Sequence, residues 1–336
     1  MGRAPGRVNL IGEHTDYNGG LCLPFALPQT TTATTTVRDD DLVRIVSRQS
    51  DEPWEGRLDS LGPGQVEGWA TYPAGVLWVL RERGWPVPGL DIEIDSAVPV
   101  GAGLSSSAAL EVAVAVAVAG LLEREITTDL RRDLVEVCRR AETEVAGAPT
   151  GGLDQTASLL CRDDHALLID FSDGSTSDVP LPLADAGLVL LVVDTRVHHE
   201  HASGGYAARR AECEAGHPRR LRHVVTENAR VRSAVDAVRF SEWDRLGRLM
   251  VASHVSLRDD FEVSCPELDT AVRASLGAGA LGARMTGGGF GGSAIALVRR
   301  ADADRVSAVV GKAFAAAGHR EPRFFLVKPS AGAGLA

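Results

Sequence analysis

The chain opens on a dense group of polar and charged side chains. Residues 6–20 (GRVNLIGEHTDYNGG) hold one arginine, two carboxylates, one histidine, one tyrosine and two asparagines beside a short apolar stretch. A hydrophobic core does not need this density, since charged side chains are rarely buried unless paired. A ligand with many hydroxyl groups does, because each hydroxyl can both donate and accept a hydrogen bond. The stretch therefore predicts a site for a polyhydroxylated small molecule, and the alternative is a solvated loop that closes a hairpin.

A second motif, residues 99–108 (PVGAGLSSSA), is rich in glycine and serine and precedes a long run of alanine and valine. A glycine-rich turn that opens a helix presents free backbone N–H groups and the positive end of the helix dipole to an anion. The motif lacks the Gly-Lys-Ser/Thr of a Walker loop, and Ser106 stands where the dinucleotide fingerprint has its third glycine. We weigh a phosphate-binding loop, whose hydroxyls could also ligate Mg²⁺, against an ordinary serine helix cap.

Two carboxylates form the third group of candidates. Asp154 lies in a polar turn bounded by Gly151 and Gly152, and Glu142 lies near the end of an amphipathic helix predicted over residues 129–146. An ionised aspartate held beside an arginine could accept the proton of an attacking hydroxyl. Glu142 and a serine hydroxyl could complete a Mg²⁺ shell, since Mg²⁺ favours one or two carboxylates plus phosphate oxygens. Taken singly, each carboxylate is more often a surface or turn residue.

Two further motifs have simpler explanations. Residues 287–292 (GGGFGG) satisfy the pattern GxGxxG, but a strand is predicted to follow them and no βαβ unit surrounds them, so we reject a dinucleotide site. We expect a glycine loop that lets the backbone approach a ligand or another loop. Residues 198–201 (HHEH) lack zinc-ligand spacing, and we interpret them as a solvated loop.

The elements that must position these motifs alternate without a strict βαβ order, which predicts an α+β fold. The length of 336 residues suggests two domains at ~100–200 residues each, with a boundary near residues 161–164. The glycine- and alanine-rich tail, residues 329–336, is expected to fray. Strands are predicted at 7–11, 21–27, 30–37, 42–47, 90–95, 166–171, 176–181, 188–194, 280–286, 293–298 and 324–328, and helices at 72–82, 106–122, 129–146, 206–213, 221–238, 241–257, 266–276 and 301–317.

Composition excludes several classes of partner. The net charge of −10 argues against nucleic acid or an anionic membrane as the main partner. Five scattered cysteines without a CxxC pair indicate reduced thiols and a cytoplasmic location. The N-terminus lacks the pattern of a signal peptide. The apolar stretch 112–122 is shorter than the ~20 residues of a membrane helix. We expect a cytoplasmic monomer.

The motifs at residues 6–20, 99–108 and 285–292 resemble, in this order, those of the galactose–homoserine–mevalonate–phosphomevalonate (GHMP) kinase superfamily. The first is similar to the signature of its galactokinase family, as are residues 151–155 and 206–213, and the similarity extends from residue 5 to about 327. The resemblance implies an N-terminal mixed sheet with helices and a C-terminal antiparallel sheet with helices, with the active site in the cleft between them. We assign residues 1–162 to a sugar- and phosphate-binding domain and residues 163–330 to the C-terminal GHMP-kinase domain.

The resemblance implies that ATP phosphorylates the anomeric hydroxyl of α-D-galactose with the help of Mg²⁺, giving galactose 1-phosphate and ADP in galactose catabolism (the Leloir pathway). By motif position, Asp154 is the catalytic base and Arg7 stabilises charge beside it. Implied sugar contacts are Glu13, His14, Asp16, Gly151 and Tyr206; implied ATP contacts are Gly101, Gly103, Leu104, Ser105, Ser106, Ser107 and Ala108; implied Mg²⁺ ligands are Ser107 and Glu142.

Two other functions remain open at this point. One is a related kinase that acts on N-acetylgalactosamine or arabinose, although Thr15 and the sequence 18–20 favour galactose. The other is a non-catalytic sensor of galactose and ATP; sensor relatives lose a Ser-Ala pair that stands here at 107–108, beside an intact Asp154 and Arg7. Family members usually carry a further segment before the first motif, so we expect either an internal start or the absence of the lid that this segment forms.

Overall fold

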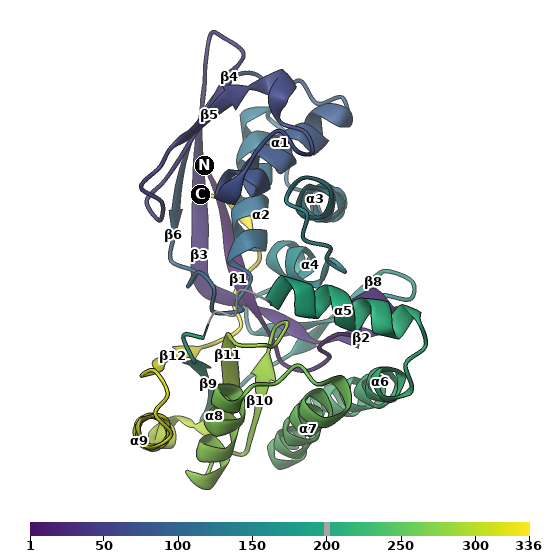
Figure 1. Cartoon of the computed structure of the whole chain (residues 1–336), viewed down its shortest axis with the longest axis vertical. Coiled ribbons are helices and arrows are strands. Elements are labelled where there is room, and N and C mark those ends of the chain that lie inside the picture. The colour runs from purple at the N-terminus through teal and green to yellow at the C-terminus, as the bar shows by residue number, and fades with distance from the viewer. Residues whose placement is uncertain (198–201) are drawn as a thin grey trace.

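The computed structural model describes residues 1–197 and 202–336, so the HHEH motif, predicted to be a solvated loop, lies outside the described residues. The molecule has two lobes stacked along its longest axis (Figure 1). The upper lobe is a sheet covered by helices on one face, and the lower lobe is a second sheet with its own helices. Both chain ends lie in the upper lobe.

The upper sheet is mixed, because β4 and β6 pair in parallel while its other neighbours are antiparallel. In β6 the alternation of apolar and polar residues buries Leu90, Ile92 and Ile94 on one face. The long β3 is rich in threonine, whose β-branched side chain suits a strand. In spatial order the strands are β13 (Gly334–Leu335), β1 (Gly2–Asn9), β3 (Pro24–Val37), β6 (Leu90–Ser96), β4 (Leu42–Ser47) and β5 (Trp54–Arg57).

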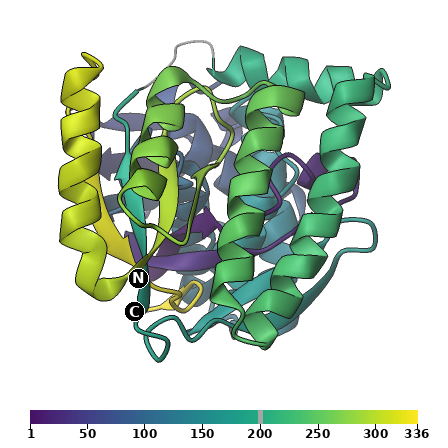
Figure 2. The same cartoon turned by 90° about the horizontal axis from the view of Figure 1, so that it is seen from below.

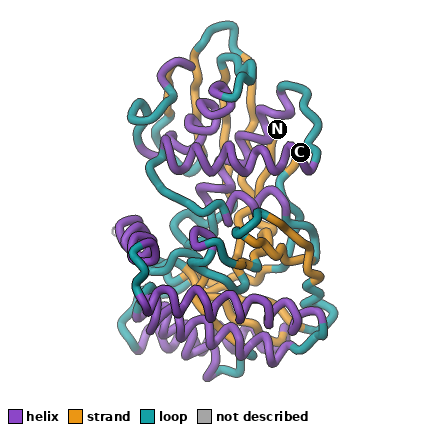
Figure 3. The backbone as a smooth tube through the Cα atoms, turned by 90° about the vertical axis from the view of Figure 1, so that its right-hand side faces the viewer, coloured by secondary structure: helices purple, strands orange, loops and turns teal. Residues whose placement is uncertain are grey.

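Helix α2 (Ser106–Leu121) is the centre of the upper lobe and packs against β1 and β3. Its alanine and valine side chains let backbones approach closely: a Cβ atom at Gly2 would lie 2.2 Å from the carbonyl oxygen of Ala113. The other helices stand in front of the sheet in Figure 3. They are α1 (Thr71–Glu82), α3 (Thr128–Arg140), α4 (Leu153–Leu160), the π-helical turn η4 (Ala141–Val145), and the 3-10 turns η2 (Leu58–Ser60) and η3 (Gly68–Ala70); a further 3-10 turn, η1 (Asp16–Asn18), lies within the first motif.

The lower lobe is built on an antiparallel sheet with β11 and β9 at its centre. The continuous apolar run of β9 is buried at every position, as expected for a strand covered on both faces. Figure 2, which is seen from below, shows helices in front of this sheet. The strands in spatial order are β10 (Gly282–Thr286), β11 (Ser293–Arg299), β9 (Leu188–Asp194) and β12 (Arg323–Val327), and the helices are α5 (Ala202–Glu214), α6 (Pro218–Arg239), α7 (Trp243–Ser256), α8 (Pro266–Gly277), α9 (Ala303–Ala316), η5 (Leu257–Phe261) and η6 (Arg300–Asp302).

A third sheet of three strands joins segments that are distant in sequence: β2 (Leu21–Cys22) pairs with β7 (His165–Asp170), and β7 with β8 (Ser175–Pro180). Apolar residues within and just after the first motif, Leu10 and Leu23 among them, belong to the core that contains β9 and α6. The first motif is therefore anchored in the lower lobe. The division into residues 1–162 and 163–330 stays a proposal.

Four local predictions are wrong. The C-terminal tail does not fray, because β13 pairs with the edge of β1 and the carbonyl of Ala333 accepts a hydrogen bond from Arg131. Two strands were predicted over 21–27 and 30–37, with a break between them. The structure has no break there, because β3 runs from Pro24 to Val37 and only its pairing with β1 shifts in register; residues 21–22 form the separate strand β2. Strand β5 was not predicted. Asp154 lies in the first turn of helix α4 rather than in a loop, because the left-handed Gly152 precedes that helix.

All five cysteines are buried and unpaired. Among the helices of residues 1–197 and 202–336, none is both long and apolar enough to cross a membrane.

Candidate active site

A cavity of about 720 Å³ is lined by side chains and backbone from all the predicted motifs. Two of the predicted site residues are not among its lining groups: Ala108 is buried in α2, and Gly151 packs against the carboxylate of Asp16. The predicted residues that line it are Arg7, Glu13, His14, Asp16, Gly101, Gly103, Leu104, Ser105, Ser106, Ser107, Glu142, Asp154 and Tyr206.

Asp154 is held from both sides at the centre of the cavity. Arg7, from β1, donates through Nε to Asp154 Oδ1 at 2.8 Å, and Ser105 Oγ donates to Oδ2 at 2.6 Å. Burial alone would lower the pKa of Arg7, but the charges of Asp154, Glu13 and Asp16 raise its pKa overall. Arg7 is therefore a permanent cation, and the Asp154 side chain, still one quarter exposed, has a fixed orientation toward the cavity.

The glycine-rich loop before α2 has its carbonyl groups tied back to the protein. Arg7 Nη1 donates to the carbonyl of Gly103 at 2.8 Å, and Ser293 Oγ donates to that of Ala102 at 2.7 Å. Gly101 and Gly103 adopt positive φ angles of 75° and 70°. The hydroxyl of Ser105, the N-cap residue, binds Asp154 and does not cap the helix, so this side chain leaves the first-turn N–H groups of α2 open. An uncapped helix N-terminus beside a cavity is suited to an anion.

The third motif forms the loop between the antiparallel strands β10 and β11, as predicted from the strand that follows it. Its backbone lies against the glycine-rich loop before α2: a Cβ atom at Gly287 would be 2.8 Å from the carbonyl oxygen of Gly103. A Cβ atom at Gly291 would be 2.5 Å from that of Val197. Glycine is required here because two backbone segments meet.

Glu13 lines a different side of the cavity from the glycine-rich loop before α2. Its Oε1 accepts hydrogen bonds from Thr286 Oγ1 at 3.1 Å and from the backbone N–H of Gly287 at 2.8 Å, and its Oε2 accepts from Asn9 Nδ2 at 3.0 Å. The guanidinium of Arg284 lies 3.6 Å from Oε1. The carboxylate is thus oriented before any ligand binds.

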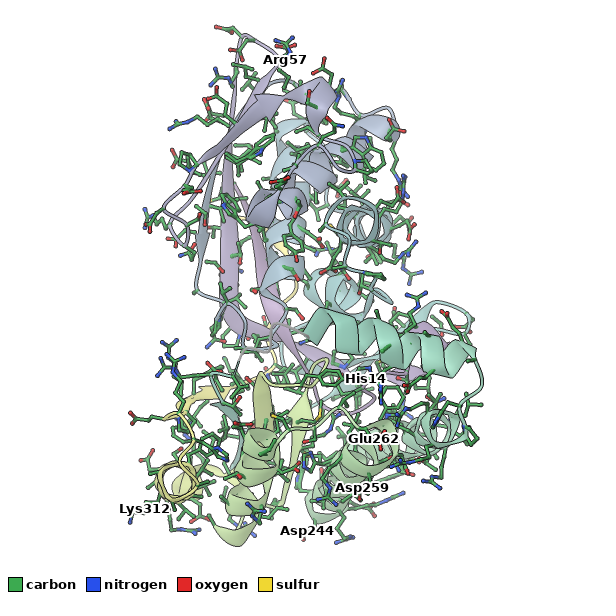
Figure 4. All side chains as sticks on the ribbon, viewed as in Figure 1. His14, Arg57, Asp244, Asp259, Glu262 and Lys312 are labelled. Atoms are coloured by element: carbon green, nitrogen blue, oxygen red, sulfur yellow. The ribbon has the colours of Figure 1, made fainter. Side chains whose placement is uncertain are left out.

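His14 lies at the junction of the lobes, next to α5 (Figure 4). Burial, followed by the charge of His223, lowers the pKa of His14 to about 3, so the imidazole is neutral at neutral pH. Its Nε2 is 3.1 Å from the carbonyl of Gly288, which can only accept, so Nε2 carries the hydrogen and Nδ1 accepts from Tyr17 Oη at 2.8 Å. The ring also lies 5.4 Å from that of Tyr206. Both ring nitrogens are already hydrogen-bonded, so His14 contributes to the cavity through the shape of its lining.

Asp16 differs from Glu13 because its carboxylate has no side-chain hydrogen-bond partner in the part of the chain that the model describes. Burial, and next the charge of Asp154, raises the pKa of Asp16 to about 7. A Cβ atom at Gly151 would lie 2.2 Å from Asp16 Oδ2, so this glycine leaves room for the carboxylate. Asp16 therefore offers an unused acceptor to a ligand.

Comparison with known proteins identifies the family. The sequence matches the models described as GHMP kinases N terminal domain over residues 71–162, galactokinase galactose-binding signature over residues 1–36 and GHMP kinases C terminal over residues 233–316. Galactokinase of Streptomyces coelicolor is 49% identical over 98% of this chain and 92% of its own length. Galactokinase of Bos taurus is 41% identical over 98% of this chain and 90% of its own length. The chain belongs to the galactokinase family.

Solved structures agree with this assignment. The crystal structure of Lactococcus lactis galactokinase complexed with galactose has a TM-score of 0.92 at 31% identity, and covers 99% of this chain and 94% of that one. A mevalonate kinase with a TM-score of 0.75 at 18% identity shows the likeness of the fold alone. The predicted GHMP-kinase-like α+β fold, with a mixed N-terminal sheet and an antiparallel C-terminal sheet, is confirmed. The prediction of a galactokinase-family enzyme is confirmed as well.

A metal ion would find a suitable pair of ligands in this galactokinase-family cavity. Ser107 Oγ donates to Glu142 Oε1 at 3.0 Å, so two hard oxygen ligands face each other beside the glycine-rich loop. Burial, and next the charge of Asp154, raises the pKa of Glu142 to about 7. No cluster of three or more His, Cys, Asp or Glu side chains able to hold a metal exists within residues 1–197 and 202–336. Such a pair fits Mg²⁺ that takes its remaining ligands from phosphate and water.

Sequence reasoning missed the buried side chains that support the galactokinase motif. Glu227, on α6, accepts from the backbone N–H of Gly12 at 3.1 Å, and His223 Nε2 lies 3.0 Å from the carbonyl of Glu13. Gln155 Nε2 donates to Glu142 Oε2 at 2.5 Å and to Glu111 Oε2 at 3.1 Å. Of these, Glu111 gave a signal in the sequence, as the charged residue that directly precedes the apolar stretch 112–122.

Proposed function

We propose that this chain transfers the γ-phosphoryl group of ATP to the anomeric hydroxyl of α-D-galactose, giving galactose 1-phosphate and ADP. The observation that carries the proposal is the place of Asp154, which Arg7 and Ser105 hold between a wall of polar side chains and an uncapped helix N-terminus. The galactose-binding signature and the likeness to a galactokinase solved with galactose support the choice of sugar.

The chemistry that we propose for this centre requires positioning and charge stabilisation more than covalent catalysis. Phosphoryl transfer passes through a loose transition state, so the attacking hydroxyl keeps its proton until late and a weak base suffices. Asp154 would accept that proton, and Arg7 would stabilise the negative charge that develops beside it. Positioned general bases contribute about 10²–10⁴-fold to the rate.

For the sugar, we propose that Asp16 and Glu13 accept hydrogen bonds from hydroxyl groups, while Tyr206 and His14 form the wall. Among the described residues Asp16 accepts hydrogen bonds from backbone N–H groups only, which leaves it able to accept from a sugar hydroxyl, and Glu13 is already oriented by the third motif. Burial raises the pKa of Tyr206 well above its usual value, so its neutral hydroxyl can donate to the sugar. Gly151 contributes by leaving space for Asp16.

For the nucleotide, we propose that the first turn of α2 and the loop from Gly101 to Ser106 bind the phosphates of ATP. Ser107 and Glu142 would hold Mg²⁺, which neutralises phosphate charge when bound. Their hard oxygen atoms and their position beside the loop support this assignment.

A sugar panel tests the proposed reaction. ADP release is measured with ATP, Mg²⁺ and one acceptor at a time: galactose, 2-deoxygalactose, galactosamine, N-acetylgalactosamine, arabinose, glucose, homoserine or mevalonate. We expect the highest kcat/KM with galactose. A higher value with N-acetylgalactosamine or arabinose would indicate the related kinase, and no release with any sugar would leave only a sensor.

A further inference from the structure

A buried chain of hydrogen bonds leads from the interior of α2 to Glu142. Glu111 and Gln155 are both 0% exposed, and Gln155 directly follows Asp154 in α4. The amide Nε2 of Gln155 donates one hydrogen to Glu111 Oε2 at 3.1 Å and the other to Glu142 Oε2 at 2.5 Å. Ser107 Oγ binds the second oxygen of Glu142 at 3.0 Å. Both oxygens of Glu142 are thus held by side chains.

Glu111 has no packing reason to be a glutamate. It lies four residues after Ser107 on α2, so the two side chains share one face of the helix. The rest of α2 from Val112 to Ala119 is buried alanine and valine, and a buried carboxyl group beside it is costly unless it is hydrogen-bonded. Burial, and next the charge of Glu142, raises the pKa of Glu111 well above its usual value. The hydrogen bond that Glu111 accepts is from Gln155.

The amide of Gln155 couples these groups geometrically. A side-chain amide nitrogen has two hydrogens in a fixed plane, so binding Glu111 with one of them sets the direction of the other. Glu111 therefore orients Gln155, and Gln155 orients the carboxylate of Glu142 toward Ser107.

We propose that Glu111 and Gln155 are positioning residues that hold Glu142 against Ser107 for the divalent cation that accompanies ATP. The inference rests on the proposed function, which assigns that cation to Ser107 and Glu142. Neither positioning residue touches the substrate. Groups that orient metal ligands typically contribute about 10–100-fold to metal affinity.

Four variants separate positioning from packing. Gln155→Met and Glu111→Met keep a side chain of similar length but remove the donor or the acceptor. Glu111→Gln keeps an acceptor oxygen for Gln155, so it should restore what Glu111→Met loses. Thr156→Val is the matched control, because it removes a local hydrogen bond to Gly152 from the same buried helix without affecting Glu142.

The probe is Mn²⁺ bound to the full-length chain in complex with ADP, followed by electron paramagnetic resonance. We expect the Mn²⁺ Kd to rise about tenfold in Gln155→Met and Glu111→Met, and to stay within about twofold of wild type in Glu111→Gln and Thr156→Val. The galactose Kd from calorimetry should be unchanged in all four.

Two results would overturn the inference. An unchanged Mn²⁺ Kd in both methionine variants removes the positioning role. Equal weakening of Mn²⁺ and galactose binding means that the two residues only support the fold. Glu142→Gln is measured in parallel: if it alone weakens Mn²⁺ binding, the inference fails and the proposed cation site stands. If Glu142→Gln also has no effect, the cation assignment fails and the inference with it.

Discussion

The two sides of the cavity are built in opposite ways. On the side that we propose for the sugar, the cavity is lined by side chains, and some of them already have their polar atoms engaged, such as Glu13 with its three hydrogen bonds. On the side that we propose for the phosphates, it is lined by backbone, with glycines at positive φ and an uncapped helix. The sugar side is anchored in the lower lobe through α6 and β10, whereas the phosphate loop belongs to the upper lobe.

This difference separates the consequences of substitution. A buried polar network is costly to break because a partner remains unsatisfied, so changes on the sugar side should reduce stability together with galactose affinity. A backbone loop has few side-chain partners to lose, so changes there should affect the nucleotide and little else. Asp154 lies where the two sides meet and should affect the reaction itself.

The largest effect is expected for Asp154→Asn. The amide keeps the size of the side chain but cannot accept the proton, so kcat should fall by about 10²–10⁴-fold. The galactose Kd should change little, because the sugar wall is intact. Stopped assays of ADP release give kcat, and calorimetry gives Kd. Near-wild-type turnover would contradict the assignment of Asp154 as the base.

The next effect is expected for Arg284→Met on the sugar side. Arg284 is fully buried and donates to the carbonyl of Asn9 at 3.1 Å beside Glu13. Removing one partner of a buried ion pair costs about 3–5 kcal/mol. We expect a lower Tm and a galactose Kd at least about tenfold weaker, at unchanged ADP affinity.

Two further variants control this prediction. Arg299→Met changes an exposed arginine on the neighbouring strand β11, and it should alter neither the Tm nor the galactose Kd. Arg284→Lys keeps the charge, and it allows the measurement even where Arg284→Met does not fold. Galactose affinity that survives in a folded Arg284→Met variant would show that the sugar wall does not depend on this network.

The sequence predicted most of the cavity lining because each motif is contiguous and its own polar residues face the cavity. The supporting residues could not be predicted in the same way. Glu227 meets Gly12 across 215 positions of sequence, and no local pattern encodes that contact. Gln155 next to Asp154 resembles an ordinary helix residue until Glu111 and Glu142 are placed beside it.

The same distinction holds for the elements. Strand β9 was predicted with its exact bounds, because a continuous apolar run between turns needs no partner to be recognised. The tail was predicted to fray from its glycine and alanine content, although pairing with β1 at the other end of the chain orders it. Local composition therefore predicts an element only where burial, rather than a distant partner, determines it.

On the phosphate side we expect a smaller effect from Gly103→Ala. Gly103 has φ of +70°, and the nearest protein atom to an added Cβ is 3.6 Å away, so the protein itself accommodates the methyl group. A non-glycine residue in this conformation costs about 1–2 kcal/mol. The strain falls on the loop that we propose to bind phosphate, so the KM for ATP should rise about tenfold while the galactose Kd is unchanged.

Gly64→Ala is the matched control for this variant. Gly64 has φ of +73° with no atom within 4 Å of an added Cβ, so it carries the same backbone strain away from the cavity. Both variants should lower the Tm by a similar amount, and only Gly103→Ala should raise the KM for ATP. An equal KM for ATP in the two variants would mean that the loop does not bind phosphate.

The smallest effect concerns Asp16, whose pKa is raised to about 7 by burial and then by the charge of Asp154. Between its usual pKa near 4 and about 7, the folded protein keeps a proton that the unfolded chain releases. The stability that this proton contributes is complete at low pH and is lost as the pH rises to about 7. Asp16→Asn removes the unfavourable buried charge, so its Tm relative to wild type should be about 2–4 °C higher at pH 8 than at pH 5. Thermal unfolding without ligand measures this difference, and Asp185→Asn, at an exposed aspartate, is the control. An equal Tm difference at both pH values would mean that Asp16 is as well solvated as a surface carboxylate.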